Sequence, residues 1–171
     1  MSPWFERRQT ESVPVSSVHY VSAIATIRAT RSQVWNFIKP AENSVLVDPE
    51  VVRGFSTPGT DGKGEIQVFI SVRDGAESVS AIEVEHEVPY ELAVTRTLGD
   101  PDPSARSRDF LQDAGDDATI LEHGLYFTWP GEAAGYFSHY EHQYRLHCQQ
   151  YVERVKAVME RDPISAATVQ A

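Results

Sequence analysis

The stretch from residue 51 to residue 129 alternates apolar and polar residues with a period of two, and short turn segments interrupt it at regular intervals. Alternation of this kind is typical of β-strands. The turns, of which Asp74-Gly75 is the clearest, are too short to hold a crossover helix, so neighbouring strands have to pair antiparallel. The pattern therefore predicts a meander of six strands, at residues 51–56, 65–72, 78–88, 90–98, 105–112 and 118–129.

The segment before this meander adds one more strand and two short helices. Residues 19–29 alternate like a strand. Thr30 can then cap a helix at 31–38, because the apolar side chains of that segment recur at helical spacing. Pro40 ends this helix, and residues 41–50 can form a second short helical turn.

The longest helix-forming stretch follows the meander, near residues 135–161, and carries a broad apolar stripe at steps of three and four. The stripe consists of Phe137, Tyr140, Tyr144, His147, Cys148, Tyr151, Val155 and Val158. A helix with such a stripe has to bury it, and the only large partner in this chain is the inward face of the meander. We therefore expect the sheet and a long C-terminal helix to share one core.

Length and composition restrict the class of protein. The 171 residues, of which 41% are hydrophobic, fit a single globular domain at 18–162 with tails at 1–17 and 163–171. The formal net charge of -10 argues against nucleic-acid binding and against anionic membrane surfaces. No apolar run is long enough to insert into a membrane, and the N-terminus lacks the apolar core of a secretory signal. We expect a cytoplasmic protein, as a monomer or a homodimer.

Three motifs carry a resemblance to a known superfamily. They are the strand end, capped turn and Val-Trp pair of IRATRSQVWNFI (27–38), the Gly-x-Gly of GKGE (62–65), and the strand, Val-Pro corner and next strand of EVEHEVPYELAVTR (83–96). With these motifs and the order of its elements, the chain from about 18 to 161 resembles the START-like or Bet v 1-like superfamily (SRPBCC), which includes polyketide cyclase/dehydrase-type proteins.

The resemblance implies an α+β helix-grip fold. In this fold a curved seven-stranded antiparallel sheet wraps around a long C-terminal helix, with two short helices after the first strand. The resemblance also implies a deep cavity that opens near the N-terminal half of the long helix, where a hydrophobic small molecule would bind.

Side-chain parity along the strands selects two histidines as candidate catalytic residues. In the strand at 78–88 the inner set contains His86, because the opposite parity would bury three glutamates. In the strand at 118–129 the inner set contains His123. An inward histidine can take up or release a proton near neutral pH. The alternative for each residue is a buried neutral imidazole that bonds a backbone carbonyl or a tyrosine.

Several aromatic side chains are candidates for ligand binding. Phe127 and Trp129 share the inner parity of the last strand, and Tyr140, Tyr144 and His147 lie on the polar-edged part of the helix stripe. Tyrosines can line a pocket because each offers apolar area and a hydroxyl group. Plain packing of the helix against the sheet is the alternative.

Arg96 has the parity of the apolar residues in its strand, and an inward arginine there would hold a ligand carboxylate or enolate. An arginine that reaches solvent at the end of the strand is an equal alternative. Arg106 and Arg108 beside Asp109 look like an ordinary charged face, and Tyr151 like a packing residue.

The sequence predicts neither a metal site nor a cofactor. His139 and His142 are three residues apart, but no Glu-x-x-His or His-Glu-x-x-His pattern accompanies them. Glycine motifs for phosphates and dinucleotides are absent, and Cys148 is the one cysteine, placed on the apolar side of the helix.

Two hypotheses about function follow from the resemblance. The first is an enzyme similar to polyketide cyclases and aromatases, which fold a reactive poly-β-keto chain for aldol closure and dehydration. Such chemistry needs orientation and a few acid and base groups in an apolar pocket. The second is a non-catalytic carrier or sensor of a lipid-like or aromatic molecule, which needs the pocket alone. Fold-level analogy does not choose between them.

Overall fold

A computed structural model describes residues 17–99, 105–129 and 134–161 of the chain. In chain order its elements are β1 (Ser17–Ile27), α1 (Arg31–Ile38), the 3-10 turn η1 (Ala41–Asn43), α2 (Ser44–Val47), β2 (Val51–Ser56), β3 (Ile66–Arg73), β4 (Ala76–Val88), β5 (Leu92–Thr97), β6 (Arg106–Gly115), β7 (Ala118–Trp129) and α3 (Ala134–Met159). Apart from Ser17, which begins β1, the predicted tails lie outside the described residues.

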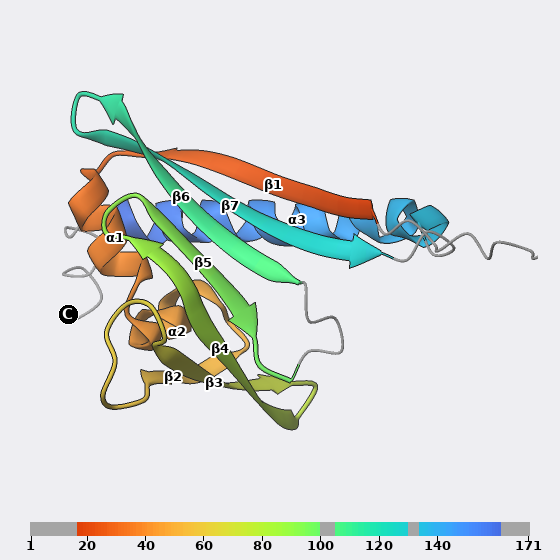
Figure 1. Cartoon of the computed structure of the whole chain (residues 1–171). Coiled ribbons are helices and arrows are strands. Elements are labelled where there is room, and N and C mark those ends of the chain that lie inside the picture. The colour runs from red at the N-terminus through yellow and green to blue at the C-terminus, as the bar shows by residue number, and fades with distance from the viewer. Residues whose placement is uncertain (1–16, 100–104, 130–133, 162–171) are drawn as a thin grey trace, which may run out of the picture.

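The seven described strands form one antiparallel sheet in the order β1-β7-β6-β5-β4-β3-β2 (Figure 1). Strands that follow one another in sequence are neighbours throughout, except that β1 pairs with β7. The predicted meander is confirmed, because short turns leave each strand beside the one before it. Among the described residues no helix has the length and apolar character that a bilayer crossing requires.

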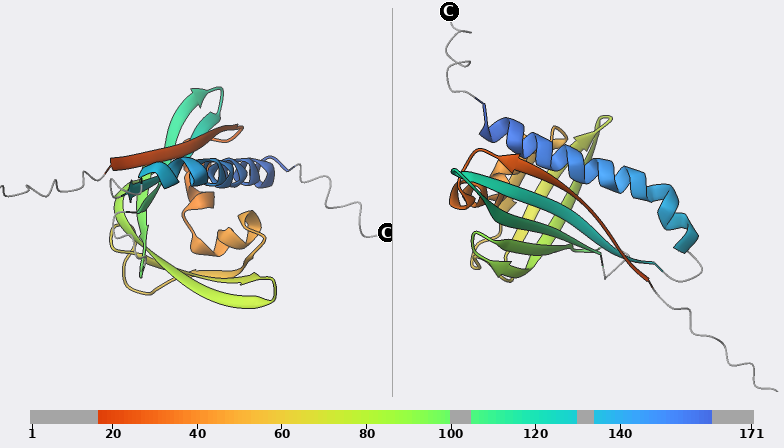
Figure 2. Two further views of the ribbon diagram at one scale, coloured as in Figure 1. Left: turned by 90° about the vertical axis from the view of Figure 1, so that its right-hand side faces the viewer. Right: turned by 90° about the horizontal axis from the view of Figure 1, so that it is seen from above.

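The sheet is strongly curved. Figure 2 shows α3 lying lengthwise along β1, while α1 and α2 occupy the hollow side of the curve between α3 and strands β2 to β4. This is the predicted α+β helix-grip arrangement, with one long C-terminal helix and short helices after the first strand. The hollow side of the sheet thus faces all three helices.

Local interactions fix the two ends of α1. Thr30 and Gln33 form a capping box, in which the Gln33 amide donates to the Thr30 hydroxyl and the Thr30 amide donates to the Gln33 side chain at 2.9 Å. At the other end Pro40 cannot donate a further helical hydrogen bond. The Asn43 side chain then donates to the carbonyl of Phe37 at 2.8 Å, so the chain turns directly into η1.

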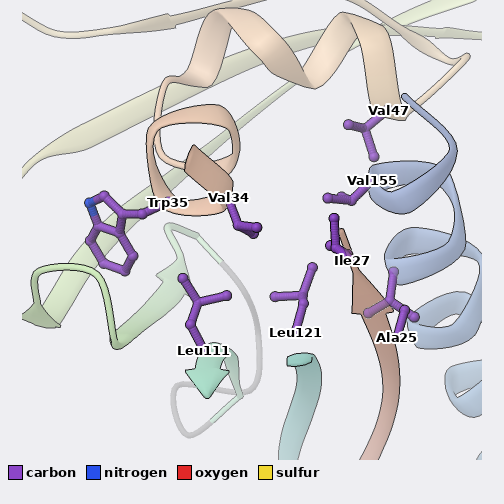
Figure 3. Close-up of a cluster of buried hydrophobic side chains, with 9 residues drawn as sticks. Ala25, Ile27, Val34, Trp35, Val47, Leu111, Leu121 and Val155 are labelled. Carbon is purple, nitrogen blue, oxygen red and sulfur yellow. The ribbon is translucent and has the colours of Figure 1, made fainter. Parts of the chain in front are cut away.

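The closed core lies where α1, α2 and α3 meet the ends of β1, β6 and β7 (Figure 3). Its members are Ala25, Ile27, Val34, Trp35, Val47, Leu111, Leu121, Val152 and Val155. The predicted stripe of α1 is confirmed here, since Trp35 is only 4% exposed. On α3 the predicted stripe holds in its C-terminal half, where Val155 is fully buried.

A β-bulge in β4 changes which side chains face the hollow side. Val84 pairs with Thr95 of β5, but the next paired residue, His86, is opposite Val94, so Glu85 is an extra residue in the ladder. A bulge of this kind shifts the alternation of side chains by one residue. Beyond it Glu87, rather than His86, is on the same face as Val84.

Candidate functional site

A cavity of about 470 Å³ lies between the hollow side of the sheet and the helices. This volume is within the usual range for pockets that hold small molecules. Much of its wall is apolar, including Trp35, Phe37, Ile38, Val47, Phe69, Ile82, Val84, Leu125 and Phe127. Its polar wall residues include Lys39, Gln67, Glu87, Asp109, His123, His147 and Tyr151.

Three of the predicted site residues line this cavity, namely His123, Phe127 and His147. His123 and Phe127 reach it from β7, where the predicted parity is confirmed, because no bulge interrupts the pairing of β7 with β1. His147 reaches it from the middle of α3. Whether any of the three binds a ligand or transfers a proton stays a prediction.

The prediction that His86 faces the cavity is wrong. The bulge at Glu85 turns the His86 side chain to the outer face of the sheet, where it is exposed. The inward position in this part of β4 belongs to Glu87, whose carboxylate lies 3.3 Å from the Lys39 ammonium group. On the outer face, His86 cannot act as an acid or a base in the cavity.

The prediction that Arg96 points inward is also wrong. The residues of β5 that line the cavity are Ala93, Thr95 and Thr97, so Arg96 lies on the outer face. There its guanidinium group pairs with the carboxylates of Glu83 at 2.6 Å and Glu85 at 3.2 Å. Arg96 thus joins neighbouring strands by ion pairs instead of meeting a ligand.

Tyr140 and Tyr144 do not line the cavity, contrary to expectation. Tyr140 is 39% exposed, and the ring of Tyr144 contacts the ring of Phe127 in a tilted arrangement, with centroids 4.3 Å apart. Tyr144 thereby packs against a second small core of Val21, Phe137 and Cys148. The side chain of Trp129, the remaining candidate, lies outside the described residues.

The cavity brings together four titratable side chains from β6, β7 and α3. Asp109 and His123 are directly opposite each other in the ladder, and the Nδ1 atom of His123 lies 2.8 Å from the Oδ1 atom of Asp109. The ring of Tyr151 is 4.3 Å from the His123 ring, centroid to centroid, and the ring of His147 is 6.4 Å from it. The two α3 residues share a helix face because they are four apart.

The Asp109 carboxylate assigns the histidine tautomer. A carboxylate only accepts, so Nδ1 of His123 carries the proton of this hydrogen bond, and in the neutral ring Nε2 keeps its lone pair. His123 is 8% exposed, which keeps the ring in one orientation. This is the arrangement of an oriented general base.

Burial changes the proton affinity of the two α3 residues. Burial raises the pKa of Tyr151 well above its ordinary value, and the negative charge of Asp109 adds to the effect. Tyr151 therefore stays a neutral hydroxyl, able to donate a hydrogen bond. For His147, burial lowers the pKa, and the neighbouring His123 lowers it further. Near neutral pH His147 is consequently an uncharged imidazole.

Sequence reasoning missed Asp109, Gln67 and Tyr151 as cavity residues. The charged residues around Asp109 predicted an outer face for it, whereas Asp109 and Arg106 both line the cavity. A usable signal was its position in the alternation, since Asp109 shares parity with Leu111, a core residue. Gln67 similarly shares parity with Phe69. Within the described ranges no group of three or more metal-ligating side chains is placed to hold an ion.

Known proteins resemble this chain in structure and not in sequence. No protein-family profile matches the sequence, and no curated protein matches it. The fold is similar to the Zhui aromatase/cyclase from Streptomyces sp. R1128, with a TM-score of 0.64 and 13% identity over 89% of this chain and 99% of that chain. It is also similar to truncated norcoclaurine synthase from Thalictrum flavum, with a TM-score of 0.66 and 9% identity over 86% of this chain and 97% of that chain.

A third similar structure is the ginseng major latex-like protein 151 from Panax ginseng, with a TM-score of 0.61 and 9% identity over 84% of this chain and 99% of that chain. The chain has the Bet v 1-like helix-grip fold. At identities this low the similarity extends to the fold and not to the activity. The function of a chain with this fold depends on the residues of its own cavity.

Proposed function

We propose that the chain binds a hydrophobic small molecule in the cavity and acts on it as a cyclase of the aldol type. The observation that carries the proposal is the hydrogen bond between Asp109 and His123 on the cavity wall. A carrier needs an apolar space alone, whereas an oriented imidazole with a free nitrogen suits proton transfer. The fold of an aromatase/cyclase with 13% identity agrees with this class of reaction by analogy.

In the proposed reaction Nε2 of His123 removes a proton from a carbon next to a ketone of the substrate. The C–H bond breaks, its electron pair forms the enolate, and the carbonyl oxygen takes up the negative charge. Asp109 stabilises the imidazolium that results, because its carboxylate already accepts the Nδ1 proton. The enolate carbon then attacks a second ketone, whose C=O π bond breaks, and the resulting alkoxide takes the proton back from Nε2 of His123. Loss of this hydroxyl together with a neighbouring α-proton releases water and gives the unsaturated ring.

Tyr151 is the proposed hydrogen-bond donor to the carbonyl oxygen that becomes charged. Its hydroxyl keeps its proton at neutral pH, because burial and Asp109 both raise its pKa. The apolar wall around Phe69, Ile82 and Leu125 would exclude water and fold the chain of the substrate. A substrate with several ketones, such as a poly-β-keto chain, fits this combination of groups.

The first step can be tested without the natural substrate. A benzo-fused cyclic ketone such as 2-tetralone exchanges its α-protons with deuterium in D₂O, and proton NMR follows the rate. We expect the wild-type protein to accelerate this exchange and His123→Gln to lose about 10²-fold of the acceleration. Asp109→Asn should also slow the exchange and change its pH profile, because an amide can hold the wrong imidazole tautomer.

His142→Gln is the matched control, since His142 is an exposed histidine of the same helix that carries His147 and does not line the cavity. It should leave the exchange rate unchanged. A wild-type protein that binds 2-tetralone but does not accelerate exchange would favour the carrier or sensor over the enzyme. Equal rates for wild type and His123→Gln would remove His123 from the mechanism.

A further inference from the structure

Gln67 of β3 is a buried polar residue in the cavity wall. It is distant from Asp109 of β6 and His123 of β7, both in the sequence and in the order of the strands. It is 8% exposed and lines the cavity. A buried amide is stable only when its donors and its acceptor have partners. The position of those partners decides which end of the amide a ligand meets.

Both neighbours of the Gln67 side chain are acceptors. Its Nε2 atom donates to the carbonyl oxygen of Lys39 at 2.9 Å and to Oε1 of Glu65 at 3.0 Å. A flipped amide would set its oxygen against these two acceptors, so the orientation of the amide is determined. Both hydrogens of the NH₂ group are thereby used.

The two acceptors are themselves held in place. The Lys39 carbonyl belongs to the C-cap residue of α1 and precedes Pro40. The Glu65 carboxylate accepts from the Ser56 hydroxyl at 2.6 Å and from the Gly62 amide at 3.2 Å. Glu65 is 5% exposed, so this part of the cavity wall is preorganised.

The remaining atom, Oε1 of Gln67, accepts no hydrogen bond within the part of the chain that the structure describes. In that same part no fully buried side-chain oxygen or nitrogen atom lacks a partner. The Oε1 atom is therefore accessible, and since Gln67 lines the cavity we assign its accessible surface to that space.

We propose that Gln67 recognises a hydroxyl group of the bound molecule, which donates to its side-chain oxygen. The inference rests on the proposed function and narrows the substrate class to phenols or enols within an otherwise apolar ring system. A ligand without a donor at this point would leave the Gln67 oxygen unpaired in a dry site, and sites of this kind reject such ligands.

Two matched probes test the proposal, 2-naphthol and its methyl ether 2-methoxynaphthalene, which lacks the donor. Their dissociation constants are measured by fluorescence titration. We expect the wild-type protein to bind 2-naphthol about tenfold more tightly than the ether. Gln67→Met keeps the length of the side chain and removes the acceptor, so it should abolish the preference while the ether still binds.

Gln112→Met, at an exposed position of β6, is the control and should keep the wild-type preference. If Gln67→Met does not fold, Glu65→Gln serves instead, because an amide at 65 can also donate, which leaves the Lys39 carbonyl as the one obligatory acceptor for Gln67 and should reduce the preference. A wild-type protein that binds both probes equally, or a Gln67→Met variant that keeps the preference, overturns the role of Gln67 alone. Binding of neither probe overturns the ligand-binding proposal itself.

Discussion

His147 illustrates how a single side chain responds to the cavity. The residue as a whole is exposed, yet the surrounding protein lowers the pKa of its ring, first through partial desolvation and second through the neighbouring His123. Arg154 acts in the same direction, while Asp48 on α2's C-cap opposes both. The folded protein therefore binds a proton at His147 less readily than the unfolded chain does.

This lowered pKa predicts a defined part of the pH dependence of stability. Below about pH 6.5, the ordinary pKa of histidine, the unfolded chain takes up a proton that folded His147 refuses. The contribution of neutral His147 to stability is complete above that pH and decreases as the pH falls toward the folded pKa. His147→Gln should therefore reduce the loss of stability between pH 7.5 and pH 5.5.

Urea unfolding at both pH values measures the effect, and the comparison uses the difference between the two free energies of unfolding rather than either value alone. His142→Gln, at an exposed position of the same helix, should leave the wild-type difference unchanged. Identical pH dependence in wild type and His147→Gln would show that burial does not shift this histidine.

At the scale of elements, the strands and helices were predictable from the sequence. Which side chains of each strand point toward the cavity was predictable for only some strands. Periodicity and turn residues predicted every strand and the helices α1 and α3, because both are local properties, while the single helical turn expected at 41–50 is divided into η1 and α2. Parity held for β7, which placed His123 correctly. In β4 it failed at the bulge, which inserts Glu85 without any glycine or other local signal.

The error at Arg96 has a different cause. Apolar residues were assumed to face inward, but on β5 the cavity wall consists of the smaller Ala93, Thr95 and Thr97. A cavity wall does not need large apolar side chains, since it leaves the space beside it unfilled. The alternation of β5 therefore predicts which residues share a face, but it does not predict which of the two faces borders the cavity.

The contact between β2 and η1 gives a prediction at this scale. A Cβ atom at Gly54 would lie 2.0 Å from the carbonyl oxygen of Ala41 and 2.6 Å from the Ser44 hydroxyl. Gly54→Ala should lower the free energy of unfolding by about 1–3 kcal/mol, the usual cost of overpacking. Alanine is otherwise no worse than glycine in a strand, so a loss can be attributed to the clash.

Urea denaturation measures this loss, with Val52→Ala as the control on the same strand. Val52 is 57% exposed, and its truncation should change stability little. An unchanged midpoint for Gly54→Ala would mean that β2 and η1 do not approach as closely as described.

At the scale of the whole molecule, the chain separates a closed core from an open cavity along the same sheet and helix. The C-terminal half of α3 packs into the core through Val152 and Val155, and among the side chains of this helix that the structure describes only His147 and Tyr151 reach the cavity. The apolar stripe predicted the helix and its burial. It did not show where packing ends and the cavity begins, because that boundary depends on the curvature of the sheet and on α1 and α2.

The last prediction tests this boundary from the middle of the sheet. Thr95 lines the cavity from β5, while the neighbouring Val94 lies on the outer face, so the two positions lie at the same place in the sheet but on opposite faces. Thr95→Phe should place a ring in the cavity and weaken binding of 2-naphthol by about tenfold or more, whereas Val94→Phe should not. Phenylalanine is favourable in strands, and the variant loses only the hydrogen bond between Thr95 and Ser107 at 2.6 Å.

Circular dichroism melts establish that both variants fold, and fluorescence titration gives the affinities. Weaker binding in Val94→Phe with an unaffected Thr95→Phe would reverse the facing of β5, and equal affinity in both variants would place the ligand outside this cavity.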